Sequence, residues 1–240
     1  MSPEPLLEVR GLVKRFGGFR ALDGVSFHLA SGEVLGLVGP NGSGKTTCIN
    51  VISGLYAPDG GAVVFEGRSI GGTRSHLLAR GGINRTFQSP KPFLSLSVRE
   101  NVEIAATYGN TGEPVDLPTL LASLELDRHA EHPAGDLNSA QQKTLDLARA
   151  LATRPRLLLV DELAAGLNPA ELGRMADRLR GLADDGMALL VVEHLMGFID
   201  KVTDRVIVMN AGREIFEGTL GEATRDPTVV QVFLGGHVPA

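Results

Sequence analysis

A glycine-rich segment near the N-terminus constrains this chain more than any other feature of its sequence. Residues 39–46 read Gly-Pro-Asn-Gly-Ser-Gly-Lys-Thr, a complete match to the pattern G-x-x-x-x-G-K-[ST]. The segment follows an apolar run, Val34–Val38, and opens a helical pattern over Lys45–Gly54. In that context, glycines let backbone N–H groups surround phosphate oxygens, and the helix N-terminus adds partial positive charge. The segment therefore predicts a phosphate-binding loop (P-loop).

The residue types of this loop predict how a nucleotide would be held. Lys45 is expected to reach the terminal phosphates, and the Thr46 hydroxyl is expected to bind Mg²⁺. The alternative is a glycine-rich turn that matches by chance, on the order of one time in a hundred for this length, before context is counted. The predicted ATP-binding residues of the loop are Gly39, Pro40, Asn41, Gly42, Ser43, Gly44, Lys45, Thr46 and Thr47.

Two further apolar runs end in residues that suit phosphate chemistry. Leu157–Val160 is followed by Asp161 and Glu162, and Ala188–Val192 is followed by a Glu-His pair that ends at His194. Alone, an Asp-Glu pair is usually the solvated start of a loop, and a lone histidine is usually structural. Three such strand ends at the ligand-binding edge of one sheet favour function. Asp161 is predicted to hold Mg²⁺, Glu162 to polarise the attacking water, and His194 to sense the phosphate.

The rest of the chain alternates short apolar runs with helical patterns, which predicts an α/β fold with helices covering a parallel sheet. Ala62–Phe65 is a further predicted strand, and Arg205–Met209 and Glu214–Phe216 are predicted to form a hairpin around Asn210–Gly212.

Strand-like runs disappear between about residues 90 and 153. Helical patterns near Val98–Ala106 and Leu117–Leu124 remain there, and the Gly- and Pro-containing stretch Tyr108–Pro118 is predicted to be a loop. We therefore predict one domain over residues 1–240, with an α/β core (1–89 and 154–240) and a helical insert (90–153).

Net charge, cysteine content and hydrophobicity indicate which kinds of partner and which cellular compartment suit the chain. The net charge of −5, without a run of Lys and Arg, disfavours a nucleic-acid partner. The single cysteine, Cys48, suits a reducing compartment and is predicted to be a small buried hydrophobic residue. No stretch approaches the roughly 20 apolar residues of a spanning helix, so a partner would have to hold the chain at a membrane.

The order of the motifs resembles an ATP-binding cassette (ABC) ATPase along the whole chain. The resemblance implies a P-loop NTPase fold of the ABC-ATPase type, with a mixed or parallel sheet core, an antiparallel β portion and an inserted α-helical subdomain. The motifs that carry it are the P-loop, Arg85–Gln88, Leu137–Gln142, Asp161–Glu162, Ala164–Asn168 and His194.

The same resemblance implies further roles and partners. Phe16 corresponds to an aromatic residue that stacks on adenine, and Gln88 to a glutamine that touches Mg²⁺ and signals toward membrane subunits. Two cassettes would close over two ATP molecules, with Mg²⁺ as the cofactor. The implied partners are a second ATP-binding subunit, transmembrane permease subunits and, indirectly, a substrate-binding protein. The expected location is cytoplasmic, peripheral on the inner face of the cell membrane, with docking through the segment Gln88–Leu96.

Two positions depart from the family pattern. The signature loop, commonly Leu-Ser-Gly-Gly-Gln, reads Leu-Asn-Ser-Ala-Gln at residues 137–141. Its residues Asn138, Ser139, Ala140 and Gln141 are expected to contact the ATP of the partner subunit. Asn138 keeps a hydrogen-bond donor, but the added Cβ atoms restrict close approach, which favours a heterodimer with a second cassette over a homodimer. Leu163 stands where proline usually follows the Asp-Glu pair, and we expect it to loosen that turn.

Details of the motifs resemble the branched-chain amino acid importer cassettes (the Liv type). These are Arg85–Gln88, Ala164–Pro169 and the tail Asp226–Gly235. Urea importers and the lipopolysaccharide-export ATPase remain alternatives. A soluble ABC-type ATPase acting on nucleic acid is disfavoured by the charge. A binding-only cassette is disfavoured by Glu162 and His194 but partly favoured by the altered signature. The predicted function is ATP hydrolysis that powers a membrane transporter, with amino acid import as the predicted process.

Overall fold

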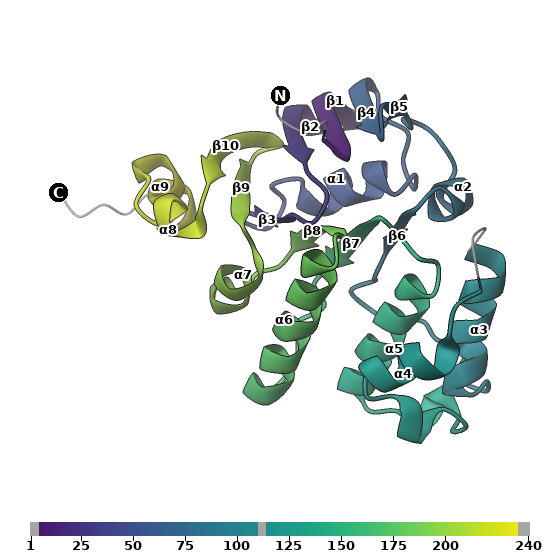
Figure 1. Ribbon diagram of the computed structural model, residues 1–240. Helices are drawn as coiled ribbons and strands as arrows, with labels where there is room; N and C mark the ends of the chain where they lie inside the picture. The colour runs from purple at the N-terminus through teal and green to yellow at the C-terminus, as the bar shows by residue number, and fades with distance from the viewer. Residues whose placement is uncertain (1–4, 110–113, 235–240) are drawn as a thin grey trace.

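Two sheets organise the chain in the computed structural model, which describes residues 5–109 and 114–234 (Figure 1). The smaller sheet is antiparallel, with the strand order β2-β1-β4-β5. Its strands are β1 (Leu7–Phe16), β2 (Phe19–Leu29), β4 (Gly60–Phe65) and β5 (Arg68–Ser69).

The larger sheet has the order β10-β9-β3-β8-β7-β6 and is parallel except for β10, which pairs antiparallel with β9. Every residue of its three central strands is buried, as expected for strands covered on both faces. Its strands are β3 (Val34–Val38), β6 (Ile83–Arg85), β7 (Leu157–Asp161), β8 (Ala188–Val192), β9 (Arg205–Asn210) and β10 (Arg213–Gly218).

Helices cover the sheets, and three of them gather beside the larger sheet with the intervening 3₁₀ turns (Figure 1). That group is α3 (Val98–Gly109), α4 (Leu117–Ser123) and α5 (Ser139–Leu151), with 3₁₀ turns at Asp127–His129 and Ala134–Asp136. The other helices are α1 (Lys45–Ile52), α2 (Ser75–Arg80), α6 (Pro169–Asp184), α7 (Met196–Val202), α8 (Leu220–Ala223) and α9 (Pro227–Leu234).

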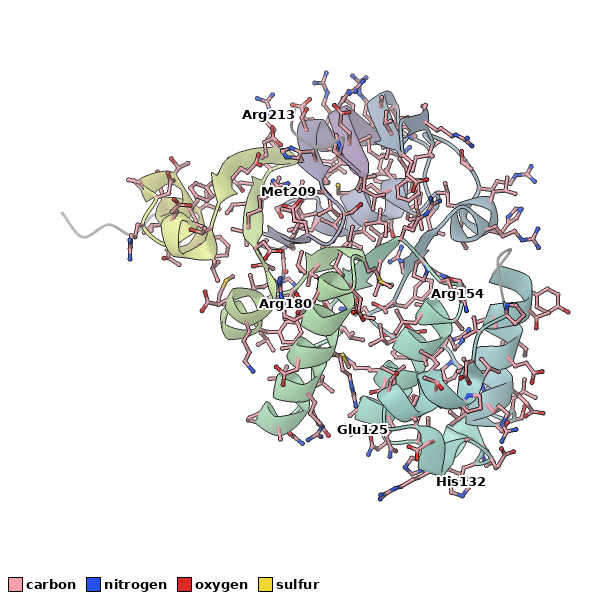
Figure 2. The ribbon with its side chains drawn as sticks, in the orientation of Figure 1. Glu125, His132, Arg154, Arg180, Met209 and Arg213 are labelled. Carbon is pink, nitrogen blue, oxygen red and sulfur yellow. The ribbon has the colours of Figure 1, made fainter. Side chains whose placement is uncertain are left out.

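Alternate residues of the central strands feed two separate hydrophobic clusters. Leu35 and Leu37 of β3 face the cluster that contains α1 and the small sheet, whereas Val34 and Val38 face the cluster that contains α5, α6 and α7. This alternation follows from the two-residue period of a strand. β10 is the edge strand of the larger sheet. Its Arg213, labelled in Figure 2, donates to Asp23 of β2 at 2.6 Å and so connects the two sheets.

The predicted strands and the closing hairpin are confirmed, and so is the α/β fold of the ABC-ATPase type. The helix after the P-loop ends at Ile52, two residues before the predicted end, because the chain turns through Gly54 at a φ of 73°. Helices also occupy both ends of the predicted loop Tyr108–Pro118, of which residues 110–113 lie outside the described residues, as does Gly235 of the tail motif. The division into a core and an insert stays a prediction.

The topology places three functional strand ends side by side. In the order β3-β8-β7, Leu37 of β3 is level with Val192 of β8, and Val192 is level with Asp161 of β7. The P-loop, the Asp-Glu pair and the segment that ends at His194 therefore leave the sheet at the same edge.

Within the two described ranges, no helix combines the length and the apolar character needed to cross a bilayer.

The thiol of Cys48 gives a test of this packing. The side chain lies on α1 and is fully buried, and burial raises the pKa of the thiol to about 12. Because the thiolate is the reactive form, only on the order of one thiol in 10⁴ is ionised at pH 8. We expect a disulfide reagent such as DTNB to leave Cys48 unmodified in the folded protein and to modify it at once in guanidinium chloride. Rapid labelling of the folded chain would contradict the packing of α1.

Candidate nucleotide-binding site

The P-loop adopts a backbone that only glycine accommodates at two of its positions. Gly39 has a φ of 146°, and a Cβ there would lie 2.2 Å from the carbonyl oxygen of Met209, which Figure 2 labels on β9. Gly44 has a φ of 109°, and a Cβ there would lie 2.6 Å from the carbonyl oxygen of Ala21. The glycine spacing of the motif is therefore a requirement of the local packing as well as of phosphate approach.

Lys45 lies inside the curve of this loop. Its Nζ donates to the carbonyl oxygens of Gly39 at 2.8 Å and Pro40 at 2.9 Å. Burial lowers the pKa of the Lys45 ammonium, and the nearby carboxylates of Glu162 and Asp161 counteract that shift. The ammonium is thus a buried cation at the centre of the predicted site.

A cavity of about 250 Å³ opens beside the P-loop and brings most of the predicted residues together. Larger hollows lie elsewhere on the surface, but this one contains the P-loop. Of the predicted ATP-binding, catalytic and metal-binding residues, five do not line it: Gly39, Pro40, Ser43, Gln88 and Asp161. It is lined by Phe16, Phe19, Ala21, Asn41, Gly42, Gly44, Lys45, Thr46, Thr47, Glu162 and His194.

The aromatic wall of the cavity comes from the turn between β1 and β2. The ring of Phe16 packs edge-on against Tyr56, with ring centroids 5.2 Å apart. Phe19, which pairs with Phe16 across the hairpin, was missed by the sequence analysis. A signal was available in the Phe-Gly-Gly-Phe sequence, because Gly-Gly favours a two-residue hairpin turn, which places the two flanking aromatic residues opposite each other on neighbouring strands.

Three predicted residues meet at the carboxylate of Glu162. His194 Nε2 lies 2.5 Å from Glu162 Oε1, and Gln88 Nε2 donates to Glu162 Oε2. Glu162 has a φ of 48°, in the left-handed region that non-glycine residues rarely adopt. Such a backbone persists where surrounding contacts hold it, and such residues cluster at active sites.

Asp161, the residue before Glu162, forms a buried ion pair. Its Oδ2 accepts from Arg85 Nη2 at 2.9 Å, and Arg85 also donates to Asn50 at 2.7 Å and Ser53 at 3.1 Å. Burial raises the pKa of Asp161, and the Arg85 guanidinium counteracts the shift. Arg85 was named only as part of the motif Arg85–Gln88, and its ion pair with Asp161 was not predicted. Its three-residue strand, β6, reaches Asp161 only through pairing with β7, 76 residues further along the chain.

The signature residues 138–141 form the N-terminal end of α5. Asn138 is the N-cap of α5: its Oδ1 accepts from Gln141 N at 2.9 Å, and Gln141 Oε1 accepts from Asn138 N at 3.0 Å. Ser139 and Ala140 form the first turn of the helix. None of these residues lines the cavity beside the P-loop.

The turn after the Asp-Glu pair is packed and hydrogen-bonded, and the expectation that Leu163 makes it looser than proline would stays a prediction. The Leu163 side chain is fully buried in the cluster that contains α5 and α6. The next amide, Ala164 N, donates to the buried carboxylate of Glu193 at 2.6 Å. Leucine thus supplies apolar packing at a position where proline commonly supplies rigidity.

Comparison with known proteins decides the family. Residues 22–165 match the family model described as ABC transporter. The chain belongs to the ABC transporter family. This ABC chain is 35% identical to the high-affinity branched-chain amino acid transport ATP-binding protein BraF of Pseudomonas aeruginosa, over 96% of the chain and 98% of that protein.

Solved structures agree with this assignment. The ABC chain matches the ADP conformation of an ATP-binding cassette with a TM-score of 0.87 and 33% identity, covering 96% of this chain and 99% of that one. It matches a dimeric structure of a bacterial ABC transporter cassette with a TM-score of 0.80 and 26% identity, covering 89% and 98%. The ABC chain is therefore a nucleotide-binding cassette and an ATPase coupled to transport, of a kind that dimerises and works with permease subunits.

Proposed function

We propose that this cassette powers the import of branched-chain amino acids from the inner face of the cell membrane. Its near-full-length similarity to BraF, a branched-chain amino acid transport protein, supports the substrate class. The observation that carries the hydrolytic role is the meeting of Gln88, Glu162 and His194 at one carboxylate beside the P-loop. A cassette that only bound nucleotide would have no need to bring these side chains together.

The geometry supports a division of labour in the site. The P-loop N–H groups and Lys45 would bind the phosphates, with Lys45 exchanging its bonds to the Gly39 and Pro40 carbonyls for phosphate oxygens. The aromatic wall at Phe16 would contact adenine. Glu162 would accept the proton of the attacking water, and His194 would orient that carboxylate and contact the phosphate.

The available oxygen donors suit Mg²⁺. Thr46, Gln88 and Asp161 would hold it, and when bound it would neutralise charge on the phosphates. Among the residues described, no group of three or more His, Cys, Asp and Glu side chains forms a metal cage. Mg²⁺ characteristically binds through one or two protein carboxylates together with phosphates and water, so this sparse donor set fits it.

Two substitutions separate nucleotide binding from hydrolysis. We expect Lys45→Ala to weaken ATP binding by roughly 10- to 100-fold, because a charge-assisted contact with the phosphates is lost. We expect Glu162→Gln to keep ATP affinity and to lower turnover by about 10²- to 10⁴-fold, because an amide is a poor proton acceptor. Calorimetric titration measures ATP affinity, and phosphate release measures turnover.

Exposed residues of the same type provide the controls. Lys201 and Glu217 do not line the cavity, so Lys201→Ala and Glu217→Gln should alter neither ATP affinity nor turnover. Unchanged ATP affinity in Lys45→Ala would refute the phosphate site. Wild-type hydrolysis by Glu162→Gln would show that another group activates the water.

The segment 88–96 is the proposed docking face for the permease subunits. Phe93 and Leu94 are 49% and 57% exposed, next to Pro90 and Pro92. The backbone at Phe93 is nevertheless fixed, because Asn101 accepts from its N–H at 2.8 Å and donates to its carbonyl at 3.0 Å. An apolar pair on a rigid backbone suits insertion into a partner groove.

A charge at this face should disrupt membrane association selectively. We expect Phe93→Asp to release the chain from vesicles that contain its permease subunits, because an aspartate would have to be desolvated in the interface. ATP affinity should stay unchanged. Flotation of vesicles measures the bound fraction, and Tyr108→Asp, at another exposed aromatic residue, is the control. Equal retention of both variants would argue against this docking face.

We further infer that the cassette works as one half of a heterodimer. In a dimer, each P-loop would pair with the partner's signature loop. Asn138 would donate through Nδ2, since its Oδ1 caps α5, but the Cβ atoms of Ser139 and Ala140 stand where glycine commonly allows close approach. A homodimer would carry this altered loop at both sites. A partner with the common signature would leave this chain's own P-loop site intact.

Restoring the common signature tests the proposed impairment. We expect Asn138→Ser, Ser139→Gly and Ala140→Gly together to speed hydrolysis by the isolated chain severalfold, because donors to transition-state charge are regained. The two glycines should also lower helix stability slightly, so a faster enzyme would not be explained by better folding. The same Ala→Gly change at Ala122 of α4 is the control. No gain in rate under conditions where dimers form would refute the impairment.

A further inference from the structure

A buried lysine from the signature helix grips the loop that carries Glu162. Lys143 lies on α5 and is only 5% exposed. Its Nζ donates to the carbonyl oxygens of Ala165 at 2.5 Å, Leu163 at 3.0 Å and Glu162 at 3.3 Å. An ammonium has three N–H donors and no acceptor, so these three carbonyls use its full hydrogen-bonding capacity.

The opposite side of the same loop is held from β8. Glu193, which is 2% exposed, accepts from Ala164 N at 2.6 Å and from His194 N at 3.3 Å. Carbonyls of the loop thus point toward Lys143, and an amide between them points toward Glu193. The two opposite charges also attract each other across the loop. Residues 162–165 are therefore fixed by one buried cation and one buried carboxylate.

The backbone of Glu162 has a conformation that must be held by surrounding contacts. Its φ of 48° is unfavourable for a residue with a Cβ and is maintained only by surrounding contacts. Glu162 N donates to Val192 O at 2.9 Å, and Lys143 binds the carbonyl of the same residue. Together these contacts set the direction of the Cα–Cβ bond, and hence the place where the carboxylate meets His194.

We propose that Lys143 is a positioning residue of the ATPase site, which holds the loop 162–165 so that the Glu162 carboxylate stays aligned beside Gln88 and His194. This inference rests on the proposed role of Glu162 in hydrolysis. Lys143 lies on the helix that begins with the signature residues Ser139 and Ala140. The grip therefore also connects the helix that begins with the signature residues to the loop that carries this chain's own hydrolytic carboxylate.

Kinetics of Lys143→Met test the grip, because methionine keeps the apolar stem and removes all three donors. We expect kcat to fall by roughly 10- to 100-fold, the scale that a misplacement of about 1 Å produces. KM and ATP affinity should stay within about twofold, since the P-loop is untouched. Lys143→Arg, which keeps N–H donors and charge, should recover part of kcat.

A matched variant separates positioning from a loss of stability. Leu147, one turn further along α5, is fully buried and makes no hydrogen bond to the loop through its side chain. Leu147→Ala should lower the Tm at least as much as Lys143→Met and leave the kcat of the folded protein unchanged. If Lys143→Met does not fold, Lys143→Gln replaces it: it is uncharged, shorter and has two N–H donors in place of three, so its kcat should fall by a smaller factor, and wild-type kcat or wild-type loop exchange in it overturns the inference.

Amide hydrogen exchange gives a second readout without nucleotide. The amides of Glu162, Ala164 and Ala165 are all hydrogen-bonded in the loop. Peptides that cover them should exchange about tenfold faster or more in Lys143→Met, but not in Leu147→Ala. Wild-type kcat or wild-type loop exchange in Lys143→Met overturns the inference. If Glu162→Gln also hydrolyses ATP normally, the proposed catalytic site fails. If Glu162→Gln is inactive while Lys143→Met is normal, only the positioning role fails.

Discussion

The parallel pairing of β3, β8 and β7 is the constraint on which the rest of the site depends. Parallel strands leave a sheet at one edge, so pairing alone brings together segments that are more than 100 residues apart in the sequence, such as the P-loop at residues 39–46 and the Asp-Glu pair at 161–162. The apolar character of these strands, with every residue buried, makes this register costly to change. The flanking helices then supply charges that reach the edge from both sides.

Buried charges at this edge are arranged in opposite-sign sets. Lys45 lies near Asp161 and Glu162, Arg85 pairs with Asp161, and Lys143 faces Glu193 across the loop. An isolated buried charge is strongly unfavourable, so the members of each set depend on one another. The hydrogen bonds of Lys143 go to neutral carbonyls, which leaves the carboxylate of Glu162 available to Gln88 and His194.

Sequence reasoning succeeded where the information is local. The P-loop, the apolar strands and the convergence of their ends follow from adjacent residues and from the rule for parallel sheets. The contacts of Arg85 and Lys143 were not predicted, because their partners lie 76 and about 20 residues away in the sequence and come close only in the folded chain. The contacts around Leu163 were not predicted, for a related reason. Its turn is contacted by Lys143 and Glu193 and is buried, and the motif itself contains none of these features.

The capping role of Asn138 limits which amino acids can occupy that position. Its side-chain oxygen is committed to the backbone N–H of Gln141, so a second atom must serve any ligand at the helix start. Aspartate would cap the helix but would present only negative charge to a phosphate. Alanine has neither an acceptor to cap the helix nor a donor for the phosphate. Serine meets both demands with one hydroxyl, which accepts and donates. Asparagine meets them with two separate atoms of its amide, and is therefore one of the few chemically workable substitutes.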